Sequence, residues 1–197
     1  PGLNIVPQLV DVDLEPPEGE LFATSLGGVG GRARVRRDTL DARCARAAQL
    51  VAAEPDQPWL LWCGLNDEAD RLTALIPGAV NVHGSMPAEQ KAELLLAFAD
   101  GEVRHLVTKP GIAAFGLNFQ HCARMAFVGL SDSYETYYQA IRRCYRYGQT
   151  RVVHAHVVVS ALEAQIASNV ARKERDATRM VAELVAAMQP HRTLEGT

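Results

Sequence analysis

The sequence predicts an α/β fold, in which a mostly parallel sheet carries helices on both faces. From Trp59 onward, short apolar runs alternate with amphipathic helical stretches, and this alternation is typical of linked strand–helix–strand units. The apolar runs are W-L-L-W-C (59–63), A-V-N-V (79–82), H-L-V-T (105–108), M-A-F-V (125–128) and V-V-H-A-H-V-V-V (152–159). The helical stretches lie near 67–75, 87–99 and 133–146. With 48% apolar and 22% charged residues, the 197-residue chain fits one globular domain, at most with an appendage.

The N-terminal part of the chain departs from this alternation. Residues 5–14 can form an edge strand, because Pro7 lacks the N–H that a central strand needs. The prolines and glycines of 15–37 indicate a connector. A helix over 38–53 follows, with Asp38 as its N-cap. Its predicted apolar face comprises Leu40, Cys44, Ala47 and Val51.

The C-terminal part begins with Ser160-x-x-Glu163, which has the pattern of a capping box. We expect this box to open a last helix that runs to about Met188. The predicted organisation is therefore an N-terminal arm (1–37), the α/β domain (38–160), and a C-terminal helix with its tail (161–197). Because the chain opens with Pro-Gly and not with Met, we also expect a piece of a longer polypeptide.

Charge and cysteine usage narrow the class of protein. The net charge of −3 does not by itself indicate a nucleic-acid binder, but four arginines and no acid occur within 142–151. The five arginines between 32 and 43 either contact phosphates or are solvated. The four cysteines are widely spaced, which predicts reduced, partly buried thiols in a cytoplasmic protein. No apolar run approaches the ~18 residues of a membrane helix, so we expect no membrane contact.

The segment Q-A-I-R-R-C-Y-R-Y-G-Q (139–149) has the clearest chemical pattern. On a helix, Gln139, Arg143 and Arg146 share one face, and Gly148 would end that helix as its C′ residue. Two guanidinium groups with no acid nearby are suited to an anion from elsewhere, and a triphosphate has the charge and geometry to match. We expect the pair to face the carboxyl edge of the sheet. A solvated basic helix face is the alternative.

This segment resembles the last conserved motif of superfamily 2 helicases, especially the Swi/Snf-type branch, whose pattern is Q-x-x-x-R-x-x-R-x-G-Q. F-G-L-N (115–118) is similar to the G-[IL]-N core of the preceding motif, at the family's spacing. H-G-S (83–85), with Lys91 and Phe98, resembles an earlier motif of that family. The resemblance covers roughly residues 55–160, and phage-type members known as DEAD/DEAH-box helicases are the most similar.

The resemblance implies a RecA-like C-terminal helicase lobe. ATP would bind between this lobe and an N-terminal RecA-like lobe of the same polypeptide, which would hold most of the ATP and the Mg. Arg146 and Arg143 would act as arginine fingers on the γ-phosphate. Gln139 would support them, and Gln149 would contact nucleotide or the other lobe. Gly116 and Asn118 would lie nearest the cleft.

The resemblance also implies a nucleic-acid track, with duplex DNA as the expected partner. In the loop K-P-G-I-A-A-F-G-L-N (109–118), Lys109 is the candidate phosphate contact, and Thr108 would serve only if the loop is rearranged. Ser85, beside Gly84, would start a helix whose free N–H groups hold a DNA phosphate. Alternatively, Ser85 is a simple N-cap.

Two further patterns imitate catalytic motifs. D-E-A-D (67–70) has the letters of a helicase metal box, but three residues separate it from the preceding strand, so Asn66 or Asp67 is better explained as a helix N-cap. His121-Cys122 could open a thiol-phosphatase loop, yet Val128 stands where that loop needs Arg. His154 and His156 share a strand face without a third ligand.

The sequence thus predicts one lobe of an ATP-hydrolysing DNA helicase or translocase, inactive as this fragment, in a bacterial or phage-infected cell. The alternative is a non-catalytic nucleic-acid-binding or protein-binding module derived from such a lobe. The sequence is compatible with DNA or RNA as the ligand, and with unwinding or translocation as the activity.

Overall fold

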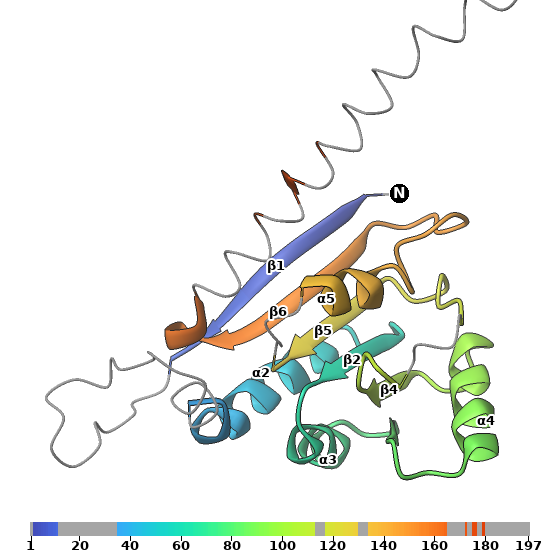
Figure 1. The fold of residues 1–197 in the computed structure, drawn as a ribbon, viewed down its shortest axis with the longest axis horizontal. Coiled ribbons are helices and arrows are strands. Elements are labelled where there is room, and N and C mark those ends of the chain that lie inside the picture. The colour runs from blue at the N-terminus through green and yellow to red at the C-terminus, as the bar shows by residue number, and fades with distance from the viewer. Residues whose placement is uncertain are drawn as a thin grey trace, which may run out of the picture.

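The computed structural model describes residues 2–11, 35–112, 117–129 and 134–164, together with residues 172, 175, 176 and 179. Within these residues, six strands form one sheet in the order β1-β6-β5-β2-β4-β3, and every neighbouring pair is parallel (Figure 1). The strands are β1 (Leu3–Val10), β2 (Trp59–Cys63), β3 (Ala79–Val82), β4 (His105–Thr108), β5 (Arg124–Val128) and β6 (Val153–Ser160). The predicted parallel α/β sheet is confirmed.

Helices cover both faces of the sheet. They are α2 (Leu40–Ala53), α3 (Asn66–Leu75), α4 (Ala88–Ala99), α5 (Tyr134–Ile141) and the short 3₁₀ helix η1 (Ala161–Glu163). Alternate residues of β2 point to opposite faces. Leu60 and Trp62 join the core under α4 and α5, whereas Leu61 joins the core under α2 and α3. The predicted helices on both faces are therefore confirmed.

The first strand is an edge strand, as Pro7 predicted. β1 spans Leu3–Val10, two residues earlier at its start than the predicted 5–14, and pairs in register with β6. Residues 12–34 of the expected connector lie outside the described residues. Because β1 belongs to the same sheet as the other strands, this part of the predicted arm is built into the α/β unit.

The helix predicted over 38–53 begins slightly later. α2 starts at Leu40, so Thr39 occupies the N-cap position and the assignment of Asp38 as N-cap is wrong. The Thr39 hydroxyl donates to the Val35 carbonyl at 2.8 Å, inside a preceding helical turn at 35–38. Leu40 is only partly buried, and Arg43 takes its place beside Cys44, Ala47 and Val51 in the buried face.

The capping box at the C-terminal end of β6 is confirmed. The amide and hydroxyl of Ser160 both donate to the Glu163 carboxylate, at 3.4 and 3.1 Å, and η1 begins there. Most of the helix predicted to follow, to about Met188, lies outside the described residues. No helix within the described part is long and apolar enough to span a bilayer.

Candidate functional site

The arginine segment follows α5, but that helix is shorter than predicted. It ends at Ile141 and not near residue 146, so Gly148 is not its C′ residue. Beyond Ile141, the amides of Arg143 and Cys144 bond to carbonyls three residues back, at 3.2 and 3.1 Å, which tightens the chain into turns. The carbonyl of Arg143 accepts a hydrogen bond from the Phe119 amide at 2.9 Å, so it bonds to another segment of the chain and not within a helix.

The tightened turns still gather the predicted side chains on one surface. An open hollow of about 480 Å³ is lined by Gln139, Arg142, Arg143, Arg146 and Tyr147, and we call it the arginine hollow. No acidic residue of the described chain lines it. The guanidinium of Arg142 lies over the Tyr138 ring at 5.3 Å. Sequence reasoning missed Arg142 and Tyr147, although Arg142 lies three residues after Gln139 and therefore on the same helical face.

The two predicted fingers differ in their surroundings. Arg146 is exposed, and its guanidinium makes no hydrogen bond or ion pair with any part of the chain that the structure describes. Arg143 is half-buried. The described lining contains three arginines and no carboxylate, so the described part of the hollow carries positive charge.

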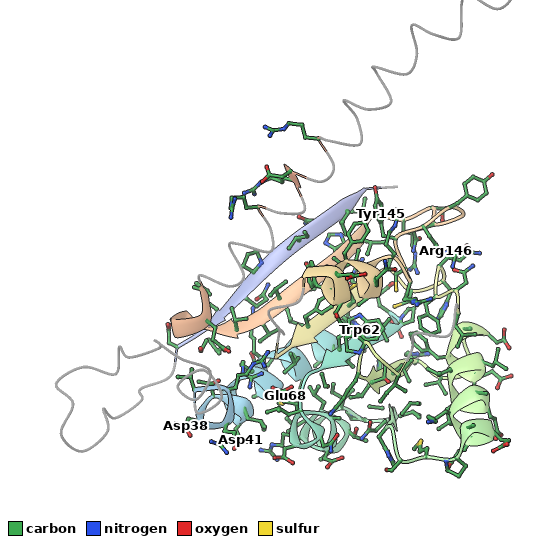
Figure 2. The ribbon with its side chains drawn as sticks, in the orientation of Figure 1. Asp38, Asp41, Trp62, Glu68, Tyr145 and Arg146 are labelled. Carbon is green, nitrogen blue, oxygen red and sulfur yellow. The ribbon has the colours of Figure 1, made fainter. Side chains whose placement is uncertain are left out.

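The arginine hollow lies at the opposite end of the sheet from the one we expected. Figure 2 shows Arg146 beyond the amino ends of the strands, whereas Glu68 lies at their carboxyl ends. The hydrogen bond from Phe119, five residues before β5, fixes Arg143 near the start of that strand. The expected position at the carboxyl edge is therefore wrong, because α5 follows the carboxyl end of β5 and runs back along the sheet, so that the arginine segment after it lies near the amino end of β5.

Of the two residues that were predicted to lie nearest the cleft, Asn118 lies at this same end. Asn118 is exposed, and its side-chain oxygen accepts from the Gln120 amide at 3.1 Å. Asn118 directly precedes Phe119 and therefore lies close to Arg143. Gly116 lies outside the described residues.

Gln149 is a buried connection between two segments. Its amide nitrogen lies 2.8 Å from the Gln120 carbonyl and 3.2 Å from the Cys122 carbonyl, and its oxygen accepts from the Arg151 amide at 3.0 Å. Only 5% of Gln149 is exposed. These bonds fit a residue that holds the arginine segment in place better than one that contacts nucleotide directly.

The predicted nucleic-acid residues form a second site, at the carboxyl ends of β3 and β4. Gly84, Ser85, Thr108 and Lys109 line an open hollow of about 560 Å³ together with Asn66 and His83, and we call it the carboxyl-edge hollow. Lys109 is half-buried and also borders a smaller cavity of about 190 Å³. Asp70 also lines the larger hollow, so the carboxyl-edge hollow contains both a positive and a negative side chain.

Two of these residues differ from expectation. Ser85 neither caps α4 nor starts it, because the helix begins at Ala88 with Pro87 at the N-cap position, and the Ser85 hydroxyl lies 2.8 Å from His83 Nδ1 instead. Thr108 is fully buried and donates its hydroxyl hydrogen to the Val82 carbonyl at 2.8 Å. The hydroxyl of Thr108 therefore supports the loop between β3 and α4 from inside.

The D-E-A-D letters have a structural role. Leu65 occupies the N-cap position of α3, so neither Asn66 nor Asp67 is the N-cap. The Glu68 carboxylate accepts from the amides of Gly64 and Leu65 at 2.9 and 3.0 Å. It also pairs with Arg43 at 2.7 Å, and both side chains are fully buried.

The ion pair between Arg43 and Glu68 was missed in the sequence. Arg43 also donates to Thr39 Oγ1 at 3.0 Å and to the Arg36 carbonyl at 2.5 Å. Arg43 is thus neither solvated nor available to a phosphate, which corrects both alternatives for this member of the arginine cluster. The spacing of Thr39 and Arg43, one helical turn apart, was the available signal.

The cysteine and histidine side chains give no sign of nucleophilic or metal-binding chemistry in the described part of the protein. All four cysteines are buried and reduced. Burial, with the nearby Glu68 carboxylate, raises the pKa of the Cys44 thiol to about 12. Burial lowers the pKa of His156. Among the described residues, no group of three or more His, Cys, Asp or Glu could hold a metal ion.

Comparison with known proteins identifies the family context. Residues 44–148, more than half of the chain, match the family described as the helicase conserved C-terminal domain. None of the curated proteins matches the chain. The matched range contains every described lining residue of both hollows.

Two solved structures share the fold. The C-terminal part of the Fun30 ATPase domain matches with a TM-score of 0.56 and 17% identity, over 63% of this chain and 43% of that one. A DEAD box protein from the hyperthermophile Methanococcus jannaschii matches with a TM-score of 0.58 and 16% identity, over 68% of this chain and 37% of that one. The chain therefore spans less than half of each of these proteins, and the likeness shows a RecA-like helicase lobe fold.

Proposed function

Because this chain belongs to the helicase conserved C-terminal domain family, we propose that it is the second RecA-like lobe of an ATP-dependent DNA helicase or translocase. The observation that supports this most directly is the arginine hollow. Its guanidinium groups converge on one open surface without an acidic residue in the described lining. Such a surface has the charge and the donors to bind the phosphates of a nucleotide.

In this proposal the chain supplies only part of the ATP site. The arginines of the hollow fit the triphosphate, whereas the described residues offer no cluster for Mg. An N-terminal lobe of the same polypeptide would hold most of the ATP and the Mg. Phosphoryl transfer spreads negative charge over the non-bridging oxygens, and a guanidinium placed there accelerates transfer by ~10³–10⁵.

Arg146 and Arg143 are the proposed fingers, and they differ in how exposed and how constrained they are. Arg146 is exposed and can reach a nucleotide that another lobe delivers. Arg143 is fixed at its backbone by Phe119 and half-buried, so it is better placed to hold its guanidinium in one position. Gln139 lines the same hollow and would orient the phosphates or the fingers.

The carboxyl-edge hollow would carry the nucleic acid. Lys109 offers an ammonium, and Gly84 and Ser85 are exposed in the turn that precedes α4. A Cβ on Gly84 would meet no atom within 4 Å, so the backbone there is accessible to a ligand from solvent. Residues 109–112 border this hollow and residues 117–123 lead to the amino end of β5, so this connection would couple the two ligands.

The test is DNA-stimulated ATP hydrolysis by the longer polypeptide that contains both lobes. Arg146→Ala is expected to lower kcat by about 10³-fold or more. Arg71→Ala is the control, because Arg71 is a partly exposed arginine on α3 that pairs with Asp41 outside the arginine hollow. This chain alone is expected to show negligible turnover. Full activity of Arg146→Ala would refute its role.

The same assays test the alternative, a binding module that has lost the motor. That module would bind DNA or a protein but would show no DNA-stimulated hydrolysis in the longer polypeptide. Arg143 and Arg146, the two proposed fingers, both line the arginine hollow, which favours the motor, because a lobe that had lost the motor would have little need to keep both.

A further inference from the structure

Tyr147 is the most exposed large hydrophobic side chain in the described part of the protein. It is 99% exposed, whereas Leu9, Leu96 and Val152 are about half exposed. A single exposed apolar residue is ordinary on a protein surface. Tyr147 differs because it lines the arginine hollow, directly after Arg146.

The backbone on either side of Tyr147 is fixed. Cys144 is fully buried, and Gln149 anchors the chain through its hydrogen bonds to the carbonyls of Gln120 and Cys122. Between them, Gly148 has φ +92° and packs against the Gln120 side chain. The backbone that carries the ring is thus anchored on both sides, and the ring extends from it into solvent at the hollow.

The chemistry around the ring matches a nucleotide. Guanidinium groups bind phosphates, an amide such as Gln139 can donate or accept, and an aromatic ring offers a face on which a base stacks. The volume of about 480 Å³ lies in the range of small-molecule sites. The hollow also lies at the other end of the sheet from the proposed nucleic-acid residues, which favours a mononucleotide over a DNA base.

From this arrangement we infer that Tyr147 stacks on the base of the ATP whose phosphates reach Arg143 and Arg146. Tyr147 is then a specificity-determining residue, because a purine offers a larger stacking face than a pyrimidine. This inference rests on the proposed function, since it needs the nucleotide to lie between two lobes.

The experiment compares three ligands in the longer polypeptide with both lobes: ATP, a pyrimidine nucleoside triphosphate, and inorganic tripolyphosphate as an inhibitor without a base. Tyr147→Ala should raise KM for ATP about tenfold, with a much smaller change in kcat. It should reduce the preference for ATP over the pyrimidine nucleotide and leave the inhibition constant of tripolyphosphate unchanged. Tyr147→Phe and Tyr147→Trp keep an aromatic ring and should therefore keep a KM for ATP close to that of the unsubstituted protein.

Leu96→Ala is the matched control, because it removes an exposed apolar side chain on α4 that lines no described hollow. An unchanged KM for ATP in Tyr147→Ala overturns the inference. So does a fall in kcat at constant KM, which indicates contact with the other lobe, or a weaker DNA activation constant alone, which indicates stacking on DNA. Loss of kcat in Arg146→Ala supports the proposed function whatever Tyr147→Ala does, so the two ideas fail separately.

Discussion

Glu68 holds three donors at once: the amides of Gly64 and Leu65 and the guanidinium of Arg43. Both charged side chains are fully buried, so water does not screen them. Removal of one partner leaves the other charge buried without compensation, which typically costs about 3–5 kcal/mol. Glu68 therefore makes a large contribution to the stability of the turn that follows β2.

We expect Glu68→Ala to lower the free energy of unfolding by about 3–5 kcal/mol, measured by urea denaturation. Glu68→Gln should also be strongly destabilising, because the amide keeps an acceptor but not the charge that Arg43 needs. The matched control is Asp67→Ala, since Asp67 is the exposed neighbour in the same D-E-A-D run and should change stability by less than about 0.5 kcal/mol. Equal effects of the two alanine variants would contradict this account.

Sequence patterns do not reveal this ion pair, because burial of a charge depends on a partner that is distant in the chain. Arg43 lies on α2 and Glu68 on α3, 25 residues apart. Arg43 instead resembles the other arginines of 32–46, several of which are exposed or half-buried. Only the apolar residues around it, such as Cys44 and Ala47, were predictable from their helical spacing.

Loops at both ends of the sheet depend on glycines with positive φ. Gly78 has φ +71°, and a Cβ added there would meet no atom within 4 Å. Gly148 has φ +92° and would place a Cβ 2.5 Å from the end of the exposed Gln120 side chain. Gly129 has φ +79° and would place one 2.4 Å from Glu68 Oε1. At Gly78 an added Cβ would cause backbone strain alone. At Gly148 it would also meet a movable side chain, and at Gly129 it would meet a carboxylate that is held in place.

We expect Gly78→Ala and Gly148→Ala each to cost about 1–3 kcal/mol of unfolding free energy, from backbone strain alone. Gln120 can move aside, so its contact adds little. Gly129→Ala should cost more than either, because Arg43 fixes the Glu68 carboxylate in place. Urea denaturation of the three variants checks the order, and a Gly129→Ala variant no less stable than Gly78→Ala would contradict it.

Element boundaries were predictable where side-chain pattern alone decides them. The apolar runs 59–63, 79–82 and 105–108 match β2, β3 and β4 residue for residue. The end of α5 was not predictable, because it depends on the bond between the Arg143 carbonyl and Phe119, which belongs to another segment. The apolar spacing of Tyr137, Ile141 and Cys144 continues past the point where the helix ends.

At the scale of the whole molecule, the two hollows lie at opposite ends of one sheet. β4 ends at the carboxyl-edge hollow, and the chain then runs through 109–123 to the start of β5, beside the arginine hollow. The sequence predicted part of each group, since the motifs are local, but it missed Arg142 and Tyr147 in the arginine hollow. It did not predict that the groups lie apart, because no pattern in 109–123 marks the crossing.

This separation predicts that the two functions respond independently to substitution. In the longer polypeptide, without ATP, Lys109→Ala should weaken DNA binding and reduce the slope of log Kd against log salt by about 1, because one phosphate contact is lost. Arg146→Ala should leave both the affinity and the slope unchanged, because its hollow lies at the far end of the sheet (Figure 2). Fluorescence anisotropy of labelled duplex DNA across a salt series measures both. A reduced slope in Arg146→Ala would place DNA on the arginine hollow, and an unchanged slope in Lys109→Ala would remove Lys109 from the track.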